Sequence, residues 1–306
     1  MKLTYYILGL LALVTSDATG NQAEDGSSLK NCQNIREKGF VEVGHYVVYN
    51  TVNNTVEAIM IHCDEKDGML QLMDKEDGTA GRSVARNCKE LQDQGVSDDG
   101  PNIIYPFSNH PDTPILVLCD QTTRGGGWTV IIRRDDSYDD LTDFGRTFEE
   151  YAAGFGDVNY DFYIGNHVIH ALTNPSQNEL LVTTEDTDGE TGYAHYQYFH
   201  IGDRDEWDLK PYTMSVGLYT GTIGDGLGYH VGMGFSTIDQ DNDISVGDCA
   251  APWGGGYGGG GWWYRACYHA CLTGPYGTMD FRWYSEAGSY YVLNKAQMMV
   301  RPSTCT

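Results

Sequence analysis

The eight cysteines of this 306-residue chain constrain its fold more than any other feature, because four of them frame an internal repeat. A shift of 56 residues superposes 31–64 on 87–120 with nine identities in 34 ungapped positions, against roughly two expected from average composition. Each copy holds two cysteines 31 residues apart, which predicts one bridge per copy, Cys32–Cys63 and Cys88–Cys119. A chance match of two cysteine-bounded loops is the alternative.

Both copies carry the pattern of a helical turn followed by a hairpin that ends at the second cysteine. The strands are expected at 46–49 and 58–62 in the first copy, and at 103–105 and 115–118 in the second. The sequence therefore predicts an extra disulfide-bridged module at 31–64, an exposed acidic connector at 65–86, and a larger domain at 87–306.

The N-terminus has the features of an export signal. Lys2 precedes an apolar run over 5–14, too short for a membrane helix of roughly 20 residues, and small residues up to Ala18 fit a cleavage site. We expect residues 1–18 to be the signal peptide of a secreted protein with no membrane span; a buried N-terminal helix is the alternative. Secretion favours disulfides and makes Asn53, in an Asn-X-Thr sequon, a candidate glycosylation site.

The charge balance narrows the range of partners. Asp and Glu number 43 against 19 Lys and Arg, a formal net charge of −24. A surface this acidic repels nucleic-acid phosphate and anionic lipid, so cations and neutral ligands are the expected partners.

From residue 125 onward, short aromatic or β-branched strands alternate with turns rich in Gly, Asp and Asn. The clearest strands are expected at 127–132, 193–199 and 215–219, and helices at 148–153 and 166–172. This order of elements predicts an α+β fold with an antiparallel sheet and argues against a doubly wound nucleotide-binding sheet.

Several ordered motifs resemble those of one family. They are Gly125-Gly126-Gly127-Trp128-Thr129-Val130-Ile131-Ile132-Arg133-Arg134, Phe235-Ser236-Thr237, Asp239-Gln240-Asp241-Asn242-Asp243, Cys249-Ala250, Trp262-Trp263-Tyr264 and Met298 to Pro302. With this set, residues 87–306 resemble a fibrinogen-related domain. The resemblance implies a small N-terminal subdomain, a central twisted antiparallel sheet, and a loop-rich C-terminal subdomain holding a calcium ion and a ligand pocket. The copy at 31–64 would be an extra N-terminal subdomain, outside the family's usual pattern.

A calcium site is also supported by the residues themselves. Asp239, Asp241 and Asp243 alternate along a turn-rich segment, so their carboxylates can converge and offer the hard oxygens that Ca²⁺ requires. The segment is not an EF-hand, because Ile244 and Ala250 stand where that loop requires Gly and Glu. The resemblance implies two carboxylate and two carbonyl ligands: Asp241, Asp243, Ser245 and Gly247. A solvated acidic turn is the alternative.

The resemblance places a ligand pocket just after the acidic segment, with a Cys249–Cys267 bridge that pins a loop beside the metal. The residues that match the acetyl-binding pocket of ficolins and tachylectins are Trp253, Ala266, Cys267, Tyr268 and Tyr291. An aromatic funnel suits an N-acetyl group, because ring faces bury its methyl group while backbone N–H groups bind its carbonyl oxygen.

The pocket departs from the family pattern. Tyr268 replaces a histidine, Thr273 replaces an asparagine, 254–261 lengthens the disulfide loop and 274–283 is shorter than usual. We therefore expect a reshaped pocket.

Two cysteines remain after three pairs are assigned. Cys271 would then pair with Cys305, which would tie the C-terminus to the pocket loop. Zinc bound by Cys267, His269 and Cys271 is the alternative.

These observations favour a secreted calcium-containing lectin that recognises acetylated carbohydrate on foreign or cell surfaces, as in innate immune recognition. The alternative is an extracellular protein-binding ligand or matrix protein of the fibrinogen-related type. An enzyme is not expected, because the glycine pattern at 254–259 lacks the strand and helix of a phosphate loop and no nucleophile is paired with a base. A homo-oligomer would have to form through globular surfaces, since no heptad stalk is present.

Overall fold

The computed structural model describes residues 84–111, 113–138, 141–204, 210–251, 259–285 and 288–303, together with the backbone of three strands nearer the N-terminus. The chain divides into two compact units, 1–83 and 84–306. The expected signal peptide, Asn53 and Cys32 lie outside the described residues, as does the side chain of Cys63.

The first unit contains an antiparallel hairpin. Strand β1 (Gly44–Val52) pairs with β2 (Thr55–Cys63), so that Gly44 lies opposite Cys63. The short strand β3 (Gln71–Leu72) pairs with β2 and lies within the stretch expected as a connector.

The second unit begins with the same hairpin. Strand β4 (Gly100–Ile104) pairs with β5 (Ile115–Asp120), and Gly100 lies opposite Cys119. The shift of 56 residues that relates the two copies therefore also relates their strand registers. The Cys88–Cys119 bridge is formed, with its Cα atoms 5.5 Å apart.

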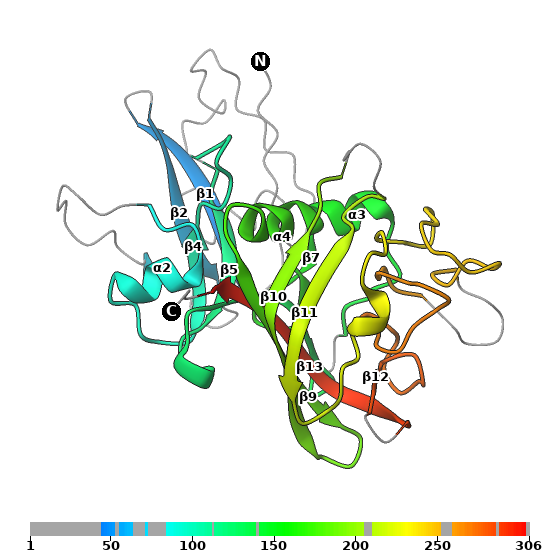
Figure 1. The fold of residues 1–306 in the computed structure, drawn as a ribbon. Helices are drawn as coiled ribbons and strands as arrows, with labels where there is room; N and C mark the ends of the chain where they lie inside the picture. Colours follow the sequence, from blue (N-terminus) through cyan, green and yellow to red (C-terminus); the bar gives the residue numbers. More distant parts are fainter. Residues whose placement is uncertain are drawn as a thin grey trace. The chain divides into compact units, whose positions relative to one another are not determined.

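A ten-stranded sheet, antiparallel in every pairing, is the frame of the second unit (Figure 1). Its path runs β11-β10-β9-β13-β6-β5-β4, with β12 pairing with β13, and β8 with β6 and β7. The remaining strands are β6 (Trp128–Asp135), β7 (Phe155–Gly156), β8 (Phe162–Tyr163), β9 (Asn178–Asp186), β10 (Thr191–Ile201), β11 (Met214–Gly221), β12 (Arg282–Tyr284) and β13 (Tyr290–Pro302). The expected α+β fold class is confirmed.

Strand β13 lies in the middle of this sheet, although the sequence analysis did not select it as a strand. Its 13 residues pair with β6 on one side and β9 on the other. Met298, Met299 and Val300 are buried at its centre, where they form part of the core. A strand from the end of the chain therefore joins the two halves of the domain.

Three short α-helices flank the sheet: α2 (Cys88–Asp93), α3 (Phe148–Ala153) and α4 (Asn166–Thr173). The last two confirm the expected helices. A capping box begins α3, because the Thr147 side chain accepts the N–H of Glu150 and the Glu150 carboxylate accepts the N–H of Thr147. None of the helices within the described part of the chain is long and apolar enough to cross a membrane.

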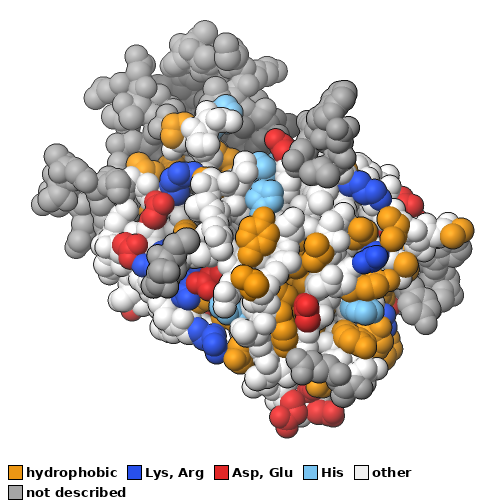
Figure 2. All heavy atoms as spheres, in the orientation of Figure 1, with side chains coloured by type: hydrophobic (Ala, Val, Ile, Leu, Met, Phe, Trp, Pro, Cys, Tyr) orange, Lys and Arg blue, Asp and Glu red, His pale blue; other side chains and the backbone are white. Residues whose placement is uncertain are grey.

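The described residues between β11 and β12 hold almost no regular structure and gather beside the sheet, in yellow and orange in Figure 1. The 3-10 helices η1 (Thr123–Gly125) and η2 (Gly228–His230) are the only other helical turns described. Trp262, Trp263 and Tyr264 belong to this segment and are fully buried. Figure 2 shows that hydrophobic side chains also reach the surface of the face drawn. Leu218 and Tyr198 are among the exposed hydrophobic residues of the described chain.

Candidate metal centre and ligand loop

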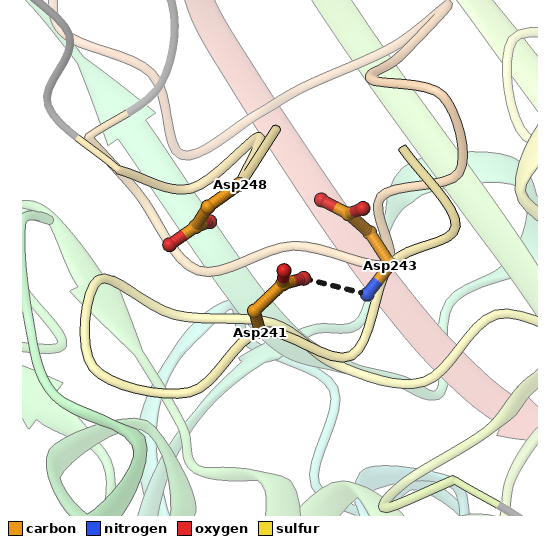
Figure 3. Close-up of side chains that lie close together, drawn as sticks. All are labelled: Asp241, Asp243 and Asp248. Carbon is orange, nitrogen blue, oxygen red and sulfur yellow. Dashed lines mark hydrogen bonds between the residues drawn. The ribbon is translucent and has the colours of Figure 1, made fainter. Parts of the chain in front are cut away.

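Three carboxylates meet in the loop-rich segment. Oxygens of Asp241, Asp243 and Asp248 all lie within 4.8 Å of one another (Figure 3). The N–H of Asp243 donates to Asp241 Oδ1 at 3.0 Å, and Asp243 in turn accepts the N–H groups of Ser245 at 2.7 Å and Cys249 at 2.9 Å. Backbone hydrogen bonds therefore orient the acidic side chains toward one another.

Asp239 does not join this cluster. Its Oδ1 accepts the Thr237 hydroxyl at 2.7 Å and the N–H of Phe148 at 2.8 Å, in the first turn of α3. A carboxylate is favoured there because the first N–H groups of a helix have no partner within the helix. The expectation that Asp239 converges with the next two acidic residues is therefore wrong, and Asp248 takes the third place. The sequence pointed to Asp248 only through its position as the next acidic residue of the same turn-rich segment.

The electrostatics of the cluster favour a bound cation. Burial raises the pKa of Asp243, and the negative charges of Asp241 and Asp248 raise it further, against the lowering effect of the two N–H groups that it accepts. A divalent cation would relieve this repulsion. The donor set is all oxygen, which fits Ca²⁺, and the predicted carbonyl ligands Ser245 and Gly247 lie in the turn between Asp243 and Asp248.

The loop 265–271 is attached to the acidic segment at two points. The Cys249–Cys267 bridge is formed, with its Cα atoms 5.2 Å apart, and the N–H of Ile244 donates to the carbonyl of Arg265 at 3.0 Å. Cys267 adopts a φ of +45°, a conformation that non-glycine residues rarely hold outside constrained loops. Because Cys267 is bridged, it is not available as a zinc thiolate, and the zinc alternative is wrong.

A buried histidine holds the other side of this loop. His230 Nδ1 lies 2.7 Å from the carbonyl of Trp263, and Nε2 accepts the N–H groups of His269 and Ala270, each at 3.2 Å. These contacts require the neutral ring with its proton on Nδ1. Burial lowers the pKa of His230 to about 3, in keeping with that form.

Tyr268, which the resemblance matches to a pocket histidine, is almost fully buried. Its hydroxyl donates to Asp280, which is 1% exposed, and the guanidinium of Arg282 lies 4.4 Å over its ring. Burial and the Asp280 carboxylate raise the pKa of Tyr268 well above its usual value. Neither Asp280 nor Arg282 was selected from the sequence, because no local pattern shows that they lie against Tyr268.

The other predicted pocket residues do not assemble around Tyr268 in the described part of the chain. Trp253 lies outside the described residues. Ala266 is exposed, and its carbonyl accepts the Tyr229 hydroxyl at 3.3 Å. Tyr291 pairs with Trp283, one position from the Tyr284–Tyr290 pair, so it lies on the opposite face of β12 and β13 from Arg282.

The structure does not form the predicted Cys271–Cys305 bridge. Cys271 is a buried free thiol in contact with the hydroxyls of Tyr264 and Thr273, and Cys305 lies outside the described residues. The backbone of Cys271 is hydrogen-bonded to the backbone of Arg282, and Arg282 in turn lies opposite Val292, near the start of β13.

The distance along β13 explains why the predicted Cys271–Cys305 bridge does not form. Arg282 lies opposite Val292, and ten residues of strand to Pro302 span about 33 Å. The three residues that follow reach back at most about 11 Å, and a disulfide needs Cα atoms within about 7 Å. Pairing by elimination failed because it took no account of this separation.

A loop-built site, pinned by a disulfide beside an antiparallel sheet, defines a binding domain of the α+β class. The family model for the C-terminal globular domain of fibrinogen beta and gamma chains matches residues 84–303, and the chain belongs to this family.

Among its relatives, Fibrinogen C domain-containing protein 1-A of Xenopus laevis is 36% identical over 236 residues, which are 74% of this chain and 49% of that protein. The chain thus spans about half the length of this relative. Microfibril-associated glycoprotein 4 of Mus musculus is 35% identical over 70% of this chain and 83% of its own length. The solved fibrinogen-like globe domain of human ANGPTL2 is similar with a TM-score of 0.64 and 34% identity, over 72% of this chain and 100% of that one.

Proposed function

We propose that this chain is a secreted recognition protein in which calcium at Asp241, Asp243 and Asp248 orders a loop that binds acetylated carbohydrate. The observation that carries the proposal is the Cys249–Cys267 bridge, which joins the acidic cluster covalently to the loop 265–271. Ser245 and Gly247 would complete the calcium site through their carbonyl oxygens. Calcium would supply no chemistry beyond holding these oxygens together, and the role proposed is binding without catalysis.

Secretion is part of the proposal. The apolar run after Lys2, the even number of cysteines and the two bridges in the described residues support an oxidising, extracellular location. The microfibril association stated in the name of Microfibril-associated glycoprotein 4 belongs to that relative, and it makes an extracellular setting reasonable here.

Retention on an N-acetylated matrix in the presence of Ca²⁺ tests the acetyl-binding function. We expect elution by free N-acetylglucosamine and, separately, by EDTA. Glucosamine, which lacks the acetyl group, should not elute the protein and serves as the matched control. A folded protein that passes through the column unretained would contradict the acetyl-binding proposal.

A second candidate function is protein binding at the same loop. It is favoured by the burial of Tyr268 against Asp280, which leaves the position of the family's pocket histidine inaccessible to a small ligand. In that case a protein partner would contact the outer surface of the loop 265–271. Retention by an extracellular-matrix extract that N-acetylglucosamine does not compete would favour this candidate over the lectin.

A further inference from the structure

Four rings form a stacked row at the surface beside the ligand loop. Tyr229 stacks on His269 at a centroid distance of 3.9 Å, His269 on Tyr284 at 4.5 Å, and Tyr284 meets Tyr290 edge-on at 5.3 Å. We call these four residues the aromatic ladder. They come from η2, from the loop 265–271 and from β12 and β13, so only the tertiary fold brings them together.

The aromatic ladder is accessible to a partner. Tyr290 is 36% exposed, and the other three members are half-buried. In Figure 2, hydrophobic and histidine side chains lie beside Lys and Arg side chains over the part of the surface where η2 and β12 appear in Figure 1. Packing on one another holds the rings in place, so a ligand would meet a surface that loses little conformational entropy on binding.

Each end of the aromatic ladder carries an arginine. The guanidinium of Arg265 lies 5.4 Å over the ring of Tyr229, and that of Arg282 lies 4.0 Å over the ring of Tyr290. Within the described part of the chain, neither arginine has a carboxylate within ion-pair distance. The Nη2 of Arg282 donates to the carbonyl of Tyr268 at 3.3 Å, while its Nε is buried with no hydrogen-bond partner.

Both arginines lack an acidic partner among the described residues, although the chain has 43 acidic and 19 basic residues. Most other arginines of the described domain satisfy their charge locally, as Arg301 does with Glu179 and Arg146 with Glu150. The exposed ring edges add to the positive character of the patch, because the edge of an aromatic ring carries partial positive charge. The patch therefore favours an anion, whereas the chain as a whole repels long polyanions.

We propose that the aromatic ladder and its two arginines bind a short anionic glycan segment that bears sulfate or carboxylate groups. Planar guanidinium groups bind carboxylate and sulfate oxygens with two parallel hydrogen bonds. Among the described residues, the hydroxyls of Tyr284 and Tyr290 make no hydrogen bond, so they can bind sugar hydroxyls between the two anionic contacts. This site shares Arg265 and His269 with the loop 265–271 but extends onto η2, β12 and β13 and takes a ligand of different charge character, an anion, so it goes beyond the function proposed above.

Tyr290 and Tyr291 offer a matched pair for the test. They are adjacent, 36% and 37% exposed, and lie on opposite faces of β13. The probe is a fully N-sulfated heparin tetrasaccharide, which carries no acetyl group, and binding is measured by calorimetry at low and at physiological salt. Tyr290→Ala should weaken binding at least 5-fold, Tyr291→Ala less than 2-fold, and added salt should weaken it for every variant.

The arginines are tested with the same probe. Arg265→Gln should weaken binding roughly 10-fold, because a charge-assisted hydrogen bond is lost. Arg282→Lys keeps the charge but not the planar fork and should weaken binding as well. Arg146→Gln, which removes an exposed arginine paired with Glu150, is the charge-matched control and should leave binding unchanged.

Three outcomes would overturn the proposal: no binding of the tetrasaccharide by the folded protein, equal loss with Arg146→Gln, or tight binding of a poly-glutamate peptide in its place. The last would assign the patch to an acidic protein segment. None of them depends on acetyl binding, since retention on the N-acetylated matrix is measured separately and should survive Tyr290→Ala.

Discussion

The hydroxyl of Tyr268 donates a hydrogen bond to the buried carboxylate of Asp280, twelve residues further along the chain. This contact buries the side chain that the family resemblance matches to a pocket histidine. It also makes Tyr268 a structural residue, because Asp280 is 1% exposed and needs a donor.

Tyr268→Phe should destabilise the protein by about 1–3 kcal/mol, the usual cost of leaving a buried acceptor without its donor. Urea denaturation measures the change. Tyr291→Phe removes a hydroxyl from a partly exposed ring and should stay within about 0.5 kcal/mol of the parent protein. Equal effects of the two changes would show that the contact with Asp280 contributes nothing to stability.

Asp243→Asn should abolish the stabilisation of the protein by Ca²⁺. At a concentration about 100 times Kd, a bound ion adds about 2.7 kcal/mol, which corresponds to roughly 5–10 °C in Tm for a domain of this size. Differential scanning calorimetry with Ca²⁺ and with EDTA measures the shift. Asp188→Asn, in an exposed acidic turn, is the matched control and should keep the full shift. A variant Asp243→Asn that still gains this shift would rule out the proposed calcium ligands.

Asp239→Ala should separate stability from calcium binding. Asp239 accepts the N–H of Phe148 at the start of α3, so its loss should lower Tm both with and without Ca²⁺, by an amount that corresponds to about 1 kcal/mol. The difference between the two conditions should remain. If the calcium-induced shift disappears as well, Asp239 belongs to the metal site after all.

His230 should make stability depend on pH. Its pKa is about 3 in the folded protein and ordinarily 6.5, so between these values the unfolded chain binds a proton that the folded protein does not. Stability from His230 is therefore complete above about pH 6.5 and is lost toward pH 3, at up to about 1.4 kcal/mol per pH unit. The stability difference between parent and His230→Gln should shrink by about 2 kcal/mol from pH 7 to pH 5. A difference that stays constant would show that His230 titrates normally.

A peptide map without reduction should show Cys88 linked to Cys119 and Cys249 linked to Cys267, with Cys271 unlinked. Cys271 should resist alkylation in the folded protein, because burial raises the pKa of its thiol, and react after denaturation. The same map checks the predicted Cys32–Cys63 bridge. A peptide that joins Cys271 to Cys305 would contradict the structure.

Local features were predictable from the sequence because neighbours in the chain cause them. Helix α3 begins and ends at the expected residues, since Thr147 and Glu150 form its capping box within four positions. The repeat predicted a hairpin in each copy, and the pairs Gly44–Cys63 and Gly100–Cys119 show the same register. The acidic segment was located for the same reason, although one of its members was misassigned.

Contacts between distant segments were not predictable, because each depends on which surfaces the fold brings together. Asp239 accepts a hydrogen bond at the start of α3, 91 residues earlier in the chain, and Asp248 is the third carboxylate of the acidic cluster instead. Elimination paired Cys271 with Cys305, while the length of β13 separates them. The aromatic ladder likewise joins η2, a loop and two strands that share no sequence pattern.

From the sequence alone we could infer the family, the Cys88–Cys119 and Cys249–Cys267 bridges and the position of the acidic segment, since motifs and spacings carry that information along the chain. The folded structure was needed to show which carboxylates meet, that Tyr268 is buried against Asp280, and that Tyr290 faces a row of rings while Tyr291 faces away. The physical reason is that side chains alternate across a strand and loops pack by non-local contacts, so a single position or a single partner changes which groups form a site.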